Sequence, residues 1–416
     1  MPDLLLIGVG CMGRPYAAAA RRLGARVRAV EAGPGVRAVA DLVDVVHLAP
    51  GDSDEALAAA AYAAVEAQRP DAVLAFSEQH VLAAALVQDT LGLPGPSLHA
   101  AVLSRNKALQ RARFGALGLR QPGHLVVERL RDAAAWAAAR GPVVVKPLSG
   151  TGSDGVELLA DAAAFASAAE RRGGEGPVLV EEAVEGPEYS WEALVRDGEV
   201  WFRNVTAKET TGPPEFVELA HRAPARLDRA AAAQVERLAL GVLAGLRMRS
   251  GLVHLEFRLT AEGPSIMEVA VRTPGDFIME VLGLAYDVDL FELTVRVALG
   301  LPLPEPPAGP VREAASCWLV APPGVVTAVQ GLDATAAHPN VHRVEAEVAP
   351  GDVVGPLRCW SERLASAVVT AGSREELEDT LAFVRRTLVV ATRPGRAELA
   401  ACASGVSASW PAALSG

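Results

Sequence analysis

The sequence predicts an α/β protein that begins with a doubly wound parallel sheet. In residues 1–100, short apolar runs such as "LLLIGVG" and "DAVLAFS" alternate with alanine-rich helical patterns. This alternation is typical of parallel strands joined by crossover helices. A smaller α/β unit follows at about 125–200, and residues 198–300 add strands and two longer helices, at 228–246 and 285–299. We therefore expect an α+β unit in the centre of the chain.

Two segments rich in proline mark domain boundaries. The first is "LGLPGPS" at residues 91–97, and the second is "LPLPEPPAGP" at 301–310, half of which is proline. A chain of 416 residues is long enough for two or three domains with sizeable cores. The predicted domains are residues 1–97, residues 98–300 with a small subdomain at about 125–195, and residues 301–416.

Three further helices are expected outside the first sheet. Residues 98–121 have the pattern of one helix that carries Lys107, and residues near 161–172 have that of another. In the last domain, "SREELEDTLAFVRRTL" is the clear helix, and the tail after Pro394 is rich in small residues.

The composition disfavours several classes of protein. The net charge of −11 disfavours a nucleic-acid partner, because a phosphate backbone demands a basic face. No stretch of about 20 apolar residues lacks charge, and the N-terminus shows no signal peptide, so we expect neither a membrane span nor export. Cys11, Cys317, Cys359 and Cys402 are scattered without metal-type spacing, which is typical of thiols in a reducing cytoplasm. The expected localisation is cytoplasmic.

A glycine turn lies near the N-terminus. Gly8-x-Gly10-x-x-Gly13 separates an apolar run from an alanine-rich helical stretch, and Glu31 ends the next apolar run. A dinucleotide-binding site would place its ribose-binding acid at about this position. The alternative is a tight strand-to-helix turn whose helix N-terminus binds a substrate carboxylate.

Lysine is rare in this chain. Of the 39 lysine and arginine residues only Lys107, Lys146 and Lys208 are lysine, and the other 36 are arginine (39 − 3 = 36). In a chain this rich in arginine, a lysine indicates a place that needs a compact ammonium group rather than a planar guanidinium. The three lysines are therefore candidate binding residues.

A glycine-rich loop follows Lys146. In "VVVKPLSGTGSDGVELL" the lysine ends an apolar strand, and three glycines with four hydroxyl or acidic side chains lead into the next strand. Glycines allow successive backbone N–H groups to turn toward an anion. The segment is not a Walker loop, because the lysine precedes the glycines. The alternative is a flexible hairpin with a surface lysine.

The segment "VLVEEAVEGPEYSWEALV" combines two apolar strands with an acidic hinge between them. Backbone groups beside Ala183 and Val184 are placed to read the edge of an adenine, and Glu188 to hold two ribose hydroxyls. Charged residues at the end of a strand are also common without any ligand.

The segment "HLEFRLTAEGPSIMEVAVR" has the pattern of a hairpin with acidic residues inside its strands. Glu256 and Glu268 each have apolar neighbours on both sides, and Arg272 follows the apolar Val271. Two carboxylates that face each other across a hairpin repel unless a cation lies between them. The pattern therefore suits Mg²⁺ held against phosphate oxygens. The alternative is that both glutamates lie on a solvated face of the sheet.

These three segments, in this order, resemble the ATP-grasp superfamily, and most closely its carboxylate–amine ligases, which join amino acids into dipeptides. The resemblance covers most of the chain. It implies an ATP-grasp fold with a Rossmann-like N-terminal domain (the pre-ATP-grasp domain) and a C-terminal lobe. Such enzymes do not use NAD in that first domain, which favours a tight turn at Gly8–Gly13.

The resemblance implies a role for each lysine and for the nucleotide loop. Lys107 and Lys146 look like the two lysines that contact ATP phosphates, and Lys208 like a third phosphate-side cation with a catalytic role. Residues 149–155 look like the lid over the triphosphate. The implied ATP-binding residues are Lys107, Lys146, Ser149, Gly150, Thr151, Gly152, Ser153, Glu181, Ala183, Val184, Glu188 and Lys208.

The resemblance also implies a metal site. Glu256 and Glu268 look like ligands of two Mg²⁺ ions, and Arg272 like the catalytic arginine that steadies the transferred phosphoryl group. Many ATP-grasp enzymes have asparagine two residues after the second glutamate, where this chain has Ala270. The pattern Glu-x-Ala-x-Arg is frequent in the amino-acid ligases, and it leaves part of the shell of the second ion to water or phosphate oxygen.

The implied reaction forms an acyl phosphate from a carboxylate and ATP, and an amine then converts it to an amide. Glu218 and His221 follow a Gly-Pro-Pro turn, and we expect them to line the substrate pocket together with Gly275 and Asp276. For Asp276 we predict a pairing with a substrate ammonium. We expect amino-acid substrates and a homodimer.

Other functions remain open at this stage. One is another ATP-grasp chemistry, such as carboxylation or purine biosynthesis. A second is an NAD-dependent oxidoreductase that uses Gly8–Gly13 and Glu31. A third is a nucleotide-binding module without turnover, which the presence of Glu256, Glu268 and Arg272 disfavours.

Overall fold

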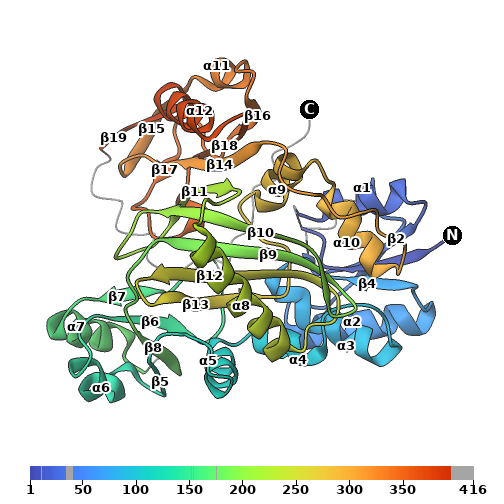
Figure 1. Cartoon of the computed structure of the whole chain (residues 1–416), viewed down its shortest axis with the longest axis horizontal. Coiled ribbons are helices and arrows are strands. Elements are labelled where there is room, and N and C mark those ends of the chain that lie inside the picture. Colours follow the sequence, from blue (N-terminus) through green and yellow to red (C-terminus); the bar gives the residue numbers. More distant parts are fainter. Residues whose placement is uncertain (11, 34–40, 151, 153, 175, 395–416) are drawn as a thin grey trace.

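The computed structural model describes residues 1–10, 12–33, 41–150, 152, 154–174 and 176–394. Within these residues the chain forms four β-sheets, of four, eight, three and four strands. Figure 1 shows the N-terminal sheet and the small sheet at opposite sides of the large central one, with the C-terminal elements above. Strands and helices are mixed throughout, which confirms the predicted α/β class.

The N-terminal sheet is parallel, with strand order β3-β2-β1-β4. Its strands carry mostly buried aliphatic residues, and helices cover both faces, as expected for a doubly wound sheet. The strands are β1 Asp3–Ile7, β2 Arg26–Glu31, β3 Val45–Leu48 and β4 Ala72–Leu74, and the helices are α1 Gly13–Arg22, α2 Asp54–Ala67 and α3 Val81–Leu91.

A small antiparallel sheet, with order β5-β8-β6-β7, forms a separate layer with its own core. Its strands are β5 His124–Val127, β6 Val143–Pro147, β7 Glu157–Leu159 and β8 Val178–Glu182, and its helices are α6 Ala134–Ala138 and α7 Ala162–Arg172.

The large sheet has eight strands in the order β13-β12-β9-β10-β11-β14-β18-β16. Its first five strands are β9 Glu188–Arg196, β10 Glu199–Thr210, β11 Glu218–Ala223, β12 Gly251–Thr260 and β13 Gly263–Ala270, and its helices include α8 Arg229–Leu246, α9 Ile278–Tyr286 and α10 Leu290–Ala298. Helix α8 packs its apolar stripe on one face, while α9 and part of α10 cover one end of the other face. The rest of that second face carries polar side chains.

The C-terminal elements continue the large sheet, because β14 pairs with β11. The predicted segment at 301–310 connects α10 to β14. A second sheet with order β17-β15-β19 and helix α12 complete this part around a shared core. The elements are β14 Glu313–Leu319, β15 Gly324–Gln330, α11 Leu332–Ala336, β16 Val341–Ala346, β17 Val353–Val354, β18 Ala365–Ala371, α12 Arg374–Thr387 and β19 Val389–Arg393.

The predicted helix 98–121 is wrong in one respect, since it forms two helices, α4 Leu98–Ser104 and α5 Lys107–Ala116. Asn106 interrupts it with an extended backbone, and its side chain caps α5 by accepting the N–H of Leu109 at 3.1 Å. Lys107 therefore begins a helix instead of lying inside one. The predicted helix 285–299 likewise divides, into the end of α9 and α10, because Asp289 caps α10.

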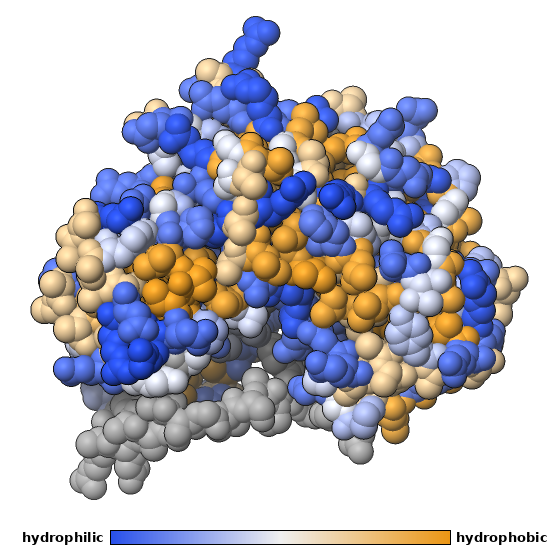
Figure 2. All heavy atoms as spheres, turned by 90° about the horizontal axis from the view of Figure 1, so that it is seen from below, coloured by the Kyte–Doolittle hydropathy of each residue, from blue (hydrophilic) through white to orange (hydrophobic). Residues whose placement is uncertain are grey.

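No helix among the described residues is long and apolar enough to cross a membrane. Figure 2 views the molecule from below and shows hydrophobic side chains in several patches, each bordered by hydrophilic ones.

Candidate active site

A cavity of about 140 Å³ lies between the small sheet and the polar face of the large sheet. Residues from both sheets and from the start of α5 form its walls. The predicted site residues that line it are Lys107, Lys146, Gly150, Gly152, Glu181, Ala183, Val184, Glu188, Glu218, Glu256, Glu268 and Arg272. The structure therefore brings these twelve predicted site residues together at one cavity, and their roles stay predictions.

On the wall formed by the small sheet, Glu181 lies between two cations. Its carboxylate is 2.7 Å from the ammonium of Lys146 on the neighbouring strand, and it also binds the guanidinium of Arg111 on α5. Burial by itself raises the pKa of Glu181, but the charges of Lys146 and Arg111 outweigh burial and lower it to about 2. Two cations share one carboxylate, so this wall keeps a positive charge.

Lys107, at the start of α5, contacts both strand β13 and the segment that follows β6. Its ammonium is 2.9 Å from Glu268 on β13 and donates to the backbone oxygen of Gly150 at 3.0 Å. Its backbone N–H, at the start of α5, donates to the oxygen of Leu148 at 2.8 Å. The break before α5 therefore places Lys107 beside the glycine-rich loop and one acidic strand.

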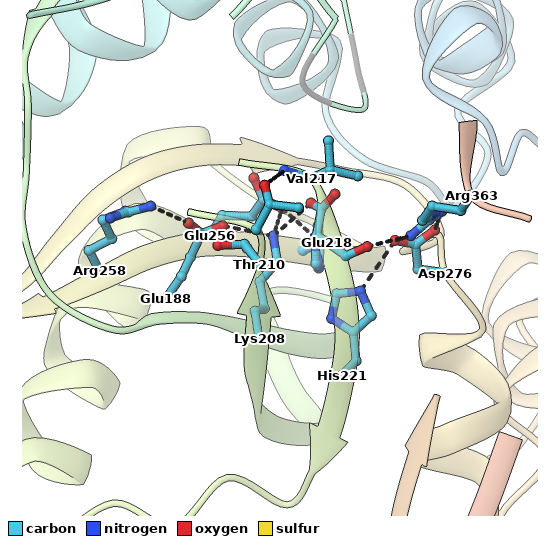
Figure 3. A network of polar contacts seen from close by, with 12 residues as sticks. Glu188, Lys208, Thr210, Val217, Glu218, His221, Glu256, Arg258, Asp276 and Arg363 are labelled. Atoms are coloured by element: carbon cyan, nitrogen blue, oxygen red, sulfur yellow. Dashed lines mark hydrogen bonds and ion pairs between the residues drawn. The ribbon is translucent and has the colours of Figure 1, made fainter. Parts of the chain in front are cut away.

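On the wall formed by the large sheet, Lys208 faces three carboxylates (Figure 3). Its ammonium lies 2.6 Å from Glu256, 3.0 Å from Glu188 and 3.1 Å from Glu218. Burial lowers the pKa of Lys208, but the carboxylates of Glu256, Glu188 and Glu218 overcome this and raise it well above the usual lysine value. Arg258 of the same sheet also binds Glu188, so two cations face three carboxylates and this group keeps excess negative charge.

Glu256 and Glu268 are directly opposite each other in the β12–β13 pairing, as the hairpin pattern predicts. The contacts to Glu256, from Lys208 and His254, both end on Oε1, so its Oε2 is left to face a ligand. Oxygen ligands of this kind fit Mg²⁺. No group of three or more His, Cys, Asp or Glu in the described part of the chain could hold a metal by itself. Such an ion would need further oxygens, from phosphate or water.

The acidic hinge is partly occupied by backbone contacts. The N–H of Ala183 donates to the oxygen of Pro142 at 3.1 Å, and the oxygen of Val184 accepts from Arg258 at 3.3 Å. Glu188 binds Arg258 at 2.8 Å through Oε2, in addition to Lys208 through Oε1. The adenine and ribose roles of this segment stay predictions.

Arg272 connects the cavity to the N-terminal domain. Its Nε is 3.2 Å from the carboxylate of Glu78, which is 8% exposed and follows β4. Burial raises the pKa of Glu78, and the charge of Arg272 opposes this shift. Two segments that are 194 residues apart in the sequence therefore meet at one edge of the cavity.

Asp276 lies just beyond the cavity, where the C-terminal lobe approaches (Figure 3). Its carboxylate binds the guanidinium of Arg363 through two bonds, of 2.8 and 2.6 Å, and lies 3.2 Å from Nε2 of His221. Burial raises its pKa, but the hydrogen bonds from Arg363 and His221 lower it strongly. Both carboxylate oxygens are thus already bonded, and a substrate ammonium would have to compete with Arg363. The pairing with an ammonium, and the substrate roles of Glu218, His221 and Gly275, stay predictions.

The glycine turn near the N-terminus is held by Glu31. One oxygen of this carboxylate accepts the N–H groups of Val9 at 2.6 Å and Gly10 at 3.2 Å. A Cβ at Gly8 would lie 1.9 Å from the ring of His80. The acid that a dinucleotide site would use for ribose therefore binds the turn itself, which favours the tight-turn interpretation over NAD binding.

One predicted loop residue, Ser149, is not part of this lining. Ser149 is exposed, while Thr151 and Ser153 lie outside the described residues.

Sequence reasoning missed several residues of the site. Arg111 lies four residues after Lys107 on the same face of α5, so helical spacing could have indicated it. His254 and Arg258 flank Glu256 at alternate positions of β12, so the alternation of a strand could have indicated both. Glu78 and Arg363 had no such signal.

Two protein-family models match the chain. Residues 139–280 match the ATP-grasp domain, and residues 317–393 match the L-amino acid ligase C-terminal domain 2. The chain therefore contains an ATP-grasp domain. The residues that line the cavity belong to the matched ATP-grasp region, except Lys107 and Pro122, which precede it in the sequence.

Curated relatives of this ATP-grasp protein include enzymes of two kinds. It is 30% identical over 294 residues to the uncharacterized protein y4rH of Sinorhizobium fredii. This match covers 69% of this chain and 61% of y4rH. It is 31% identical to carnosine synthase 1 of Gallus gallus over 79% of this chain, but over only 39% of that enzyme. The chain thus spans less than two thirds of both relatives. It is also 29% identical to the formate-dependent phosphoribosylglycinamide formyltransferase of Chlorobaculum tepidum, over 81% of this chain and 86% of that one.

The fold has close counterparts among solved structures. The L-amino acid ligase from Bacillus licheniformis superimposes with a TM-score of 0.82 at 23% identity, over 94% of this chain and 99% of the other. At this identity the likeness shows that the two chains share the fold.

Proposed function

We propose that this ATP-grasp protein is an ATP-dependent carboxylate–amine ligase that joins two amino acids, or an amino acid and another amine, into a dipeptide or amide. The observation that carries the proposal is that Lys107 and Lys146 line one cavity with the paired Glu256 and Glu268, while Lys208, the third lysine, is buried against Glu256. Such a set of ammonium groups and carboxylates suits a triphosphate and its metal. The match of residues 317–393 to the L-amino acid ligase C-terminal domain favours amino-acid substrates.

In the first step, an oxygen of the substrate carboxylate bonds to the γ-phosphorus of ATP, and the bond to the departing ADP breaks. Lys107 and Lys146 would bind phosphate oxygens, and Arg272 would steady the transferred group. Mg²⁺ held by Glu256 and Glu268, two ions in our proposal, supplies further positive charge. Catalysis of this kind rests on positioning and charge neutralisation.

In the second step, the amine of the other substrate bonds to the acyl carbon, phosphate leaves, and the nitrogen loses a proton. Water must be kept out, because it would hydrolyse the acyl phosphate. The glycine-rich loop beside Lys107 is placed to cover that region, since Gly150 accepts a hydrogen bond from the lysine ammonium.

The test is a matrix of amino-acid pairs, scored by ATP-dependent phosphate release and by mass spectrometry of the products. We expect phosphate release that requires both amino acids, together with a product whose mass equals the sum of the pair minus water. Phosphate release that no amino-acid pair stimulates, with no condensed product, would overturn the proposal.

A second candidate is purine-type ATP-grasp chemistry, which the similarity to the formyltransferase favours. The same assay with formate or bicarbonate and a ribonucleotide amine separates the two. Product formation only with those substrates would replace the amino-acid ligase with this alternative.

We also propose a cytoplasmic homodimer. ATP is available in the cytoplasm, and Cys317 and Cys359 are free thiols. Val102 on α4, Leu109 on α5 and Leu117 directly after α5 are between 40% and 43% exposed, and a contiguous apolar patch formed by such residues would suit a subunit contact. Sedimentation that gives only the mass of one chain would overturn the dimer.

A further inference from the structure

A row of buried polar residues crosses three neighbouring strands of the large sheet. Glu192 on β9 is directly opposite His254 on β12 and, on its other side, opposite Asn204 on β10. Because alternate residues of a strand share a face, His254 lies on the same face as Glu256. The row therefore leads from the interior of the sheet to the acidic wall of the cavity.

Every oxygen of Glu192 has a partner. Oε1 accepts from Nδ1 of His254 at 3.1 Å, while Oε2 accepts the hydroxyl of Thr206 at 2.7 Å and the amide of Asn204 at 3.3 Å. Asn204 in turn accepts the hydroxyl of Tyr286 at 3.0 Å. Glu192 is 2% exposed. A buried carboxylate held by three donors has one orientation, and it fixes the ring of His254.

The other nitrogen of this ring reaches the acidic wall. Nε2 of His254 is 3.3 Å from Oε1 of Glu256, the same oxygen that Lys208 binds at 2.6 Å. Both contacts to Glu256 are thus on one oxygen, and Oε2 is held toward the cavity. His254 itself lines the cavity but is only 6% exposed.

We propose that Glu192 and His254 are positioning residues that orient Glu256 as a metal ligand. This inference rests on the proposed function, because it requires a divalent cation at Glu256 and Glu268. Residues that orient a ligand through hydrogen bonds change metal affinity about 10- to 100-fold when replaced. Glu192 reaches Glu256 only through the ring of His254, and the proposed effect of both residues passes through Glu256.

The test measures binding of Mn²⁺ by electron paramagnetic resonance in the presence of a non-hydrolysable ATP analogue. We expect His254→Leu and Glu192→Gln each to weaken Mn²⁺ binding about 10-fold or more. Glu192→Gln is nearly isosteric, and it remains informative if the apolar variant does not fold. A matched control is His99→Leu, whose ring contacts the backbone of Gly245 far from this row in the sequence and should leave Mn²⁺ binding unchanged.

A cycle with Glu256→Gln distinguishes positioning from a general structural role. If His254 acts through Glu256, adding His254→Leu to Glu256→Gln produces no further loss of Mn²⁺ affinity. An equal further loss in that background would overturn the inference, as would wild-type Mn²⁺ binding by both single variants. If Glu256→Gln itself binds Mn²⁺ like the wild type, the metal site of the proposed function fails, and that result is distinct from the first two.

Discussion

The two walls of the cavity have opposite charge. On the small-sheet side, Lys146 and Arg111 share the single carboxylate of Glu181. On the large-sheet side, Lys208 binds Glu188, Glu218 and Glu256, and Arg258 is a second cation at Glu188, so two cations face three carboxylates. One wall therefore attracts anions and the other attracts cations, although the two lie across one cavity from each other.

This difference teaches how one cavity can hold a triphosphate and its metal together. Phosphate oxygens suit the basic wall, and Mg²⁺ suits the acidic wall, so each charge is met from its own side. The contact between Lys107 and Glu268 joins the walls at the start of α5. The predictions below test this division of charge, in order of decreasing effect.

The largest effect is expected from Glu256→Gln, which removes a charge from the acidic wall. Because a catalytic metal contributes several kcal/mol, we expect turnover to fall about 1000-fold or more. Steady-state phosphate release at saturating Mg²⁺ measures this loss. The matched control is Glu262→Gln, an exposed change at the tip of the same hairpin, which should leave turnover unchanged. Equal rates for the two variants would contradict an acidic wall that binds metal.

On the basic wall, the pKa of Glu181 makes stability dependent on pH. Its folded value, about 2, is below the ordinary value of 4.5, so the unfolded chain binds the proton first as the pH falls. The stabilisation is fully present above pH 4.5 and is lost between 4.5 and 2. From the size of the shift it is about 3 kcal/mol. Urea unfolding of the wild type and of Glu181→Gln should give a difference that shrinks as the pH falls; a constant difference would contradict this origin.

Lys146→Met tests phosphate binding by the same basic wall. Loss of one preorganised cation at the phosphates is expected to lower kcat/KM for ATP about 100-fold. Lys146→Arg should recover only part of it, because the planar guanidinium differs in shape and hydration. Arg129→Met, an exposed change on the small subdomain, serves as the control for ATP kinetics. Wild-type kinetics in Lys146→Met would remove phosphate binding from this wall.

The smallest effect is expected outside the cavity. Glu31→Gln weakens the hydrogen bonds to Val9 and Gly10 and should lower the free energy of unfolding by about 1 kcal/mol. It should leave ATP affinity, measured by calorimetry, as in the wild type. A large loss of ATP affinity would show that a charge outside the two cavity walls also contributes to ATP binding.

The parts that sequence reasoning predicted depend on local pattern. The pairing of Glu256 with Glu268 follows from a hairpin with alternating apolar residues, and the register confirms it. The three lysines were singled out by composition, and the structure brings all three to the cavity or its acidic wall. The helix break at Asn106 was missed, because the capping asparagine lies inside an otherwise helical pattern.

By itself, the sequence determined the α/β class, the strands that carry the acidic residues and the scarcity of ammonium groups, because these depend on residue type and on spacing over a few positions. Only the tertiary structure decided which charges pair. Arg272 meets Glu78 across 194 residues, and Arg363 meets Asp276 across 87. Nothing in the local spacing constrains such partners, because the packing of separate sheets and lobes brings them together and the buried charges then select one another at short range.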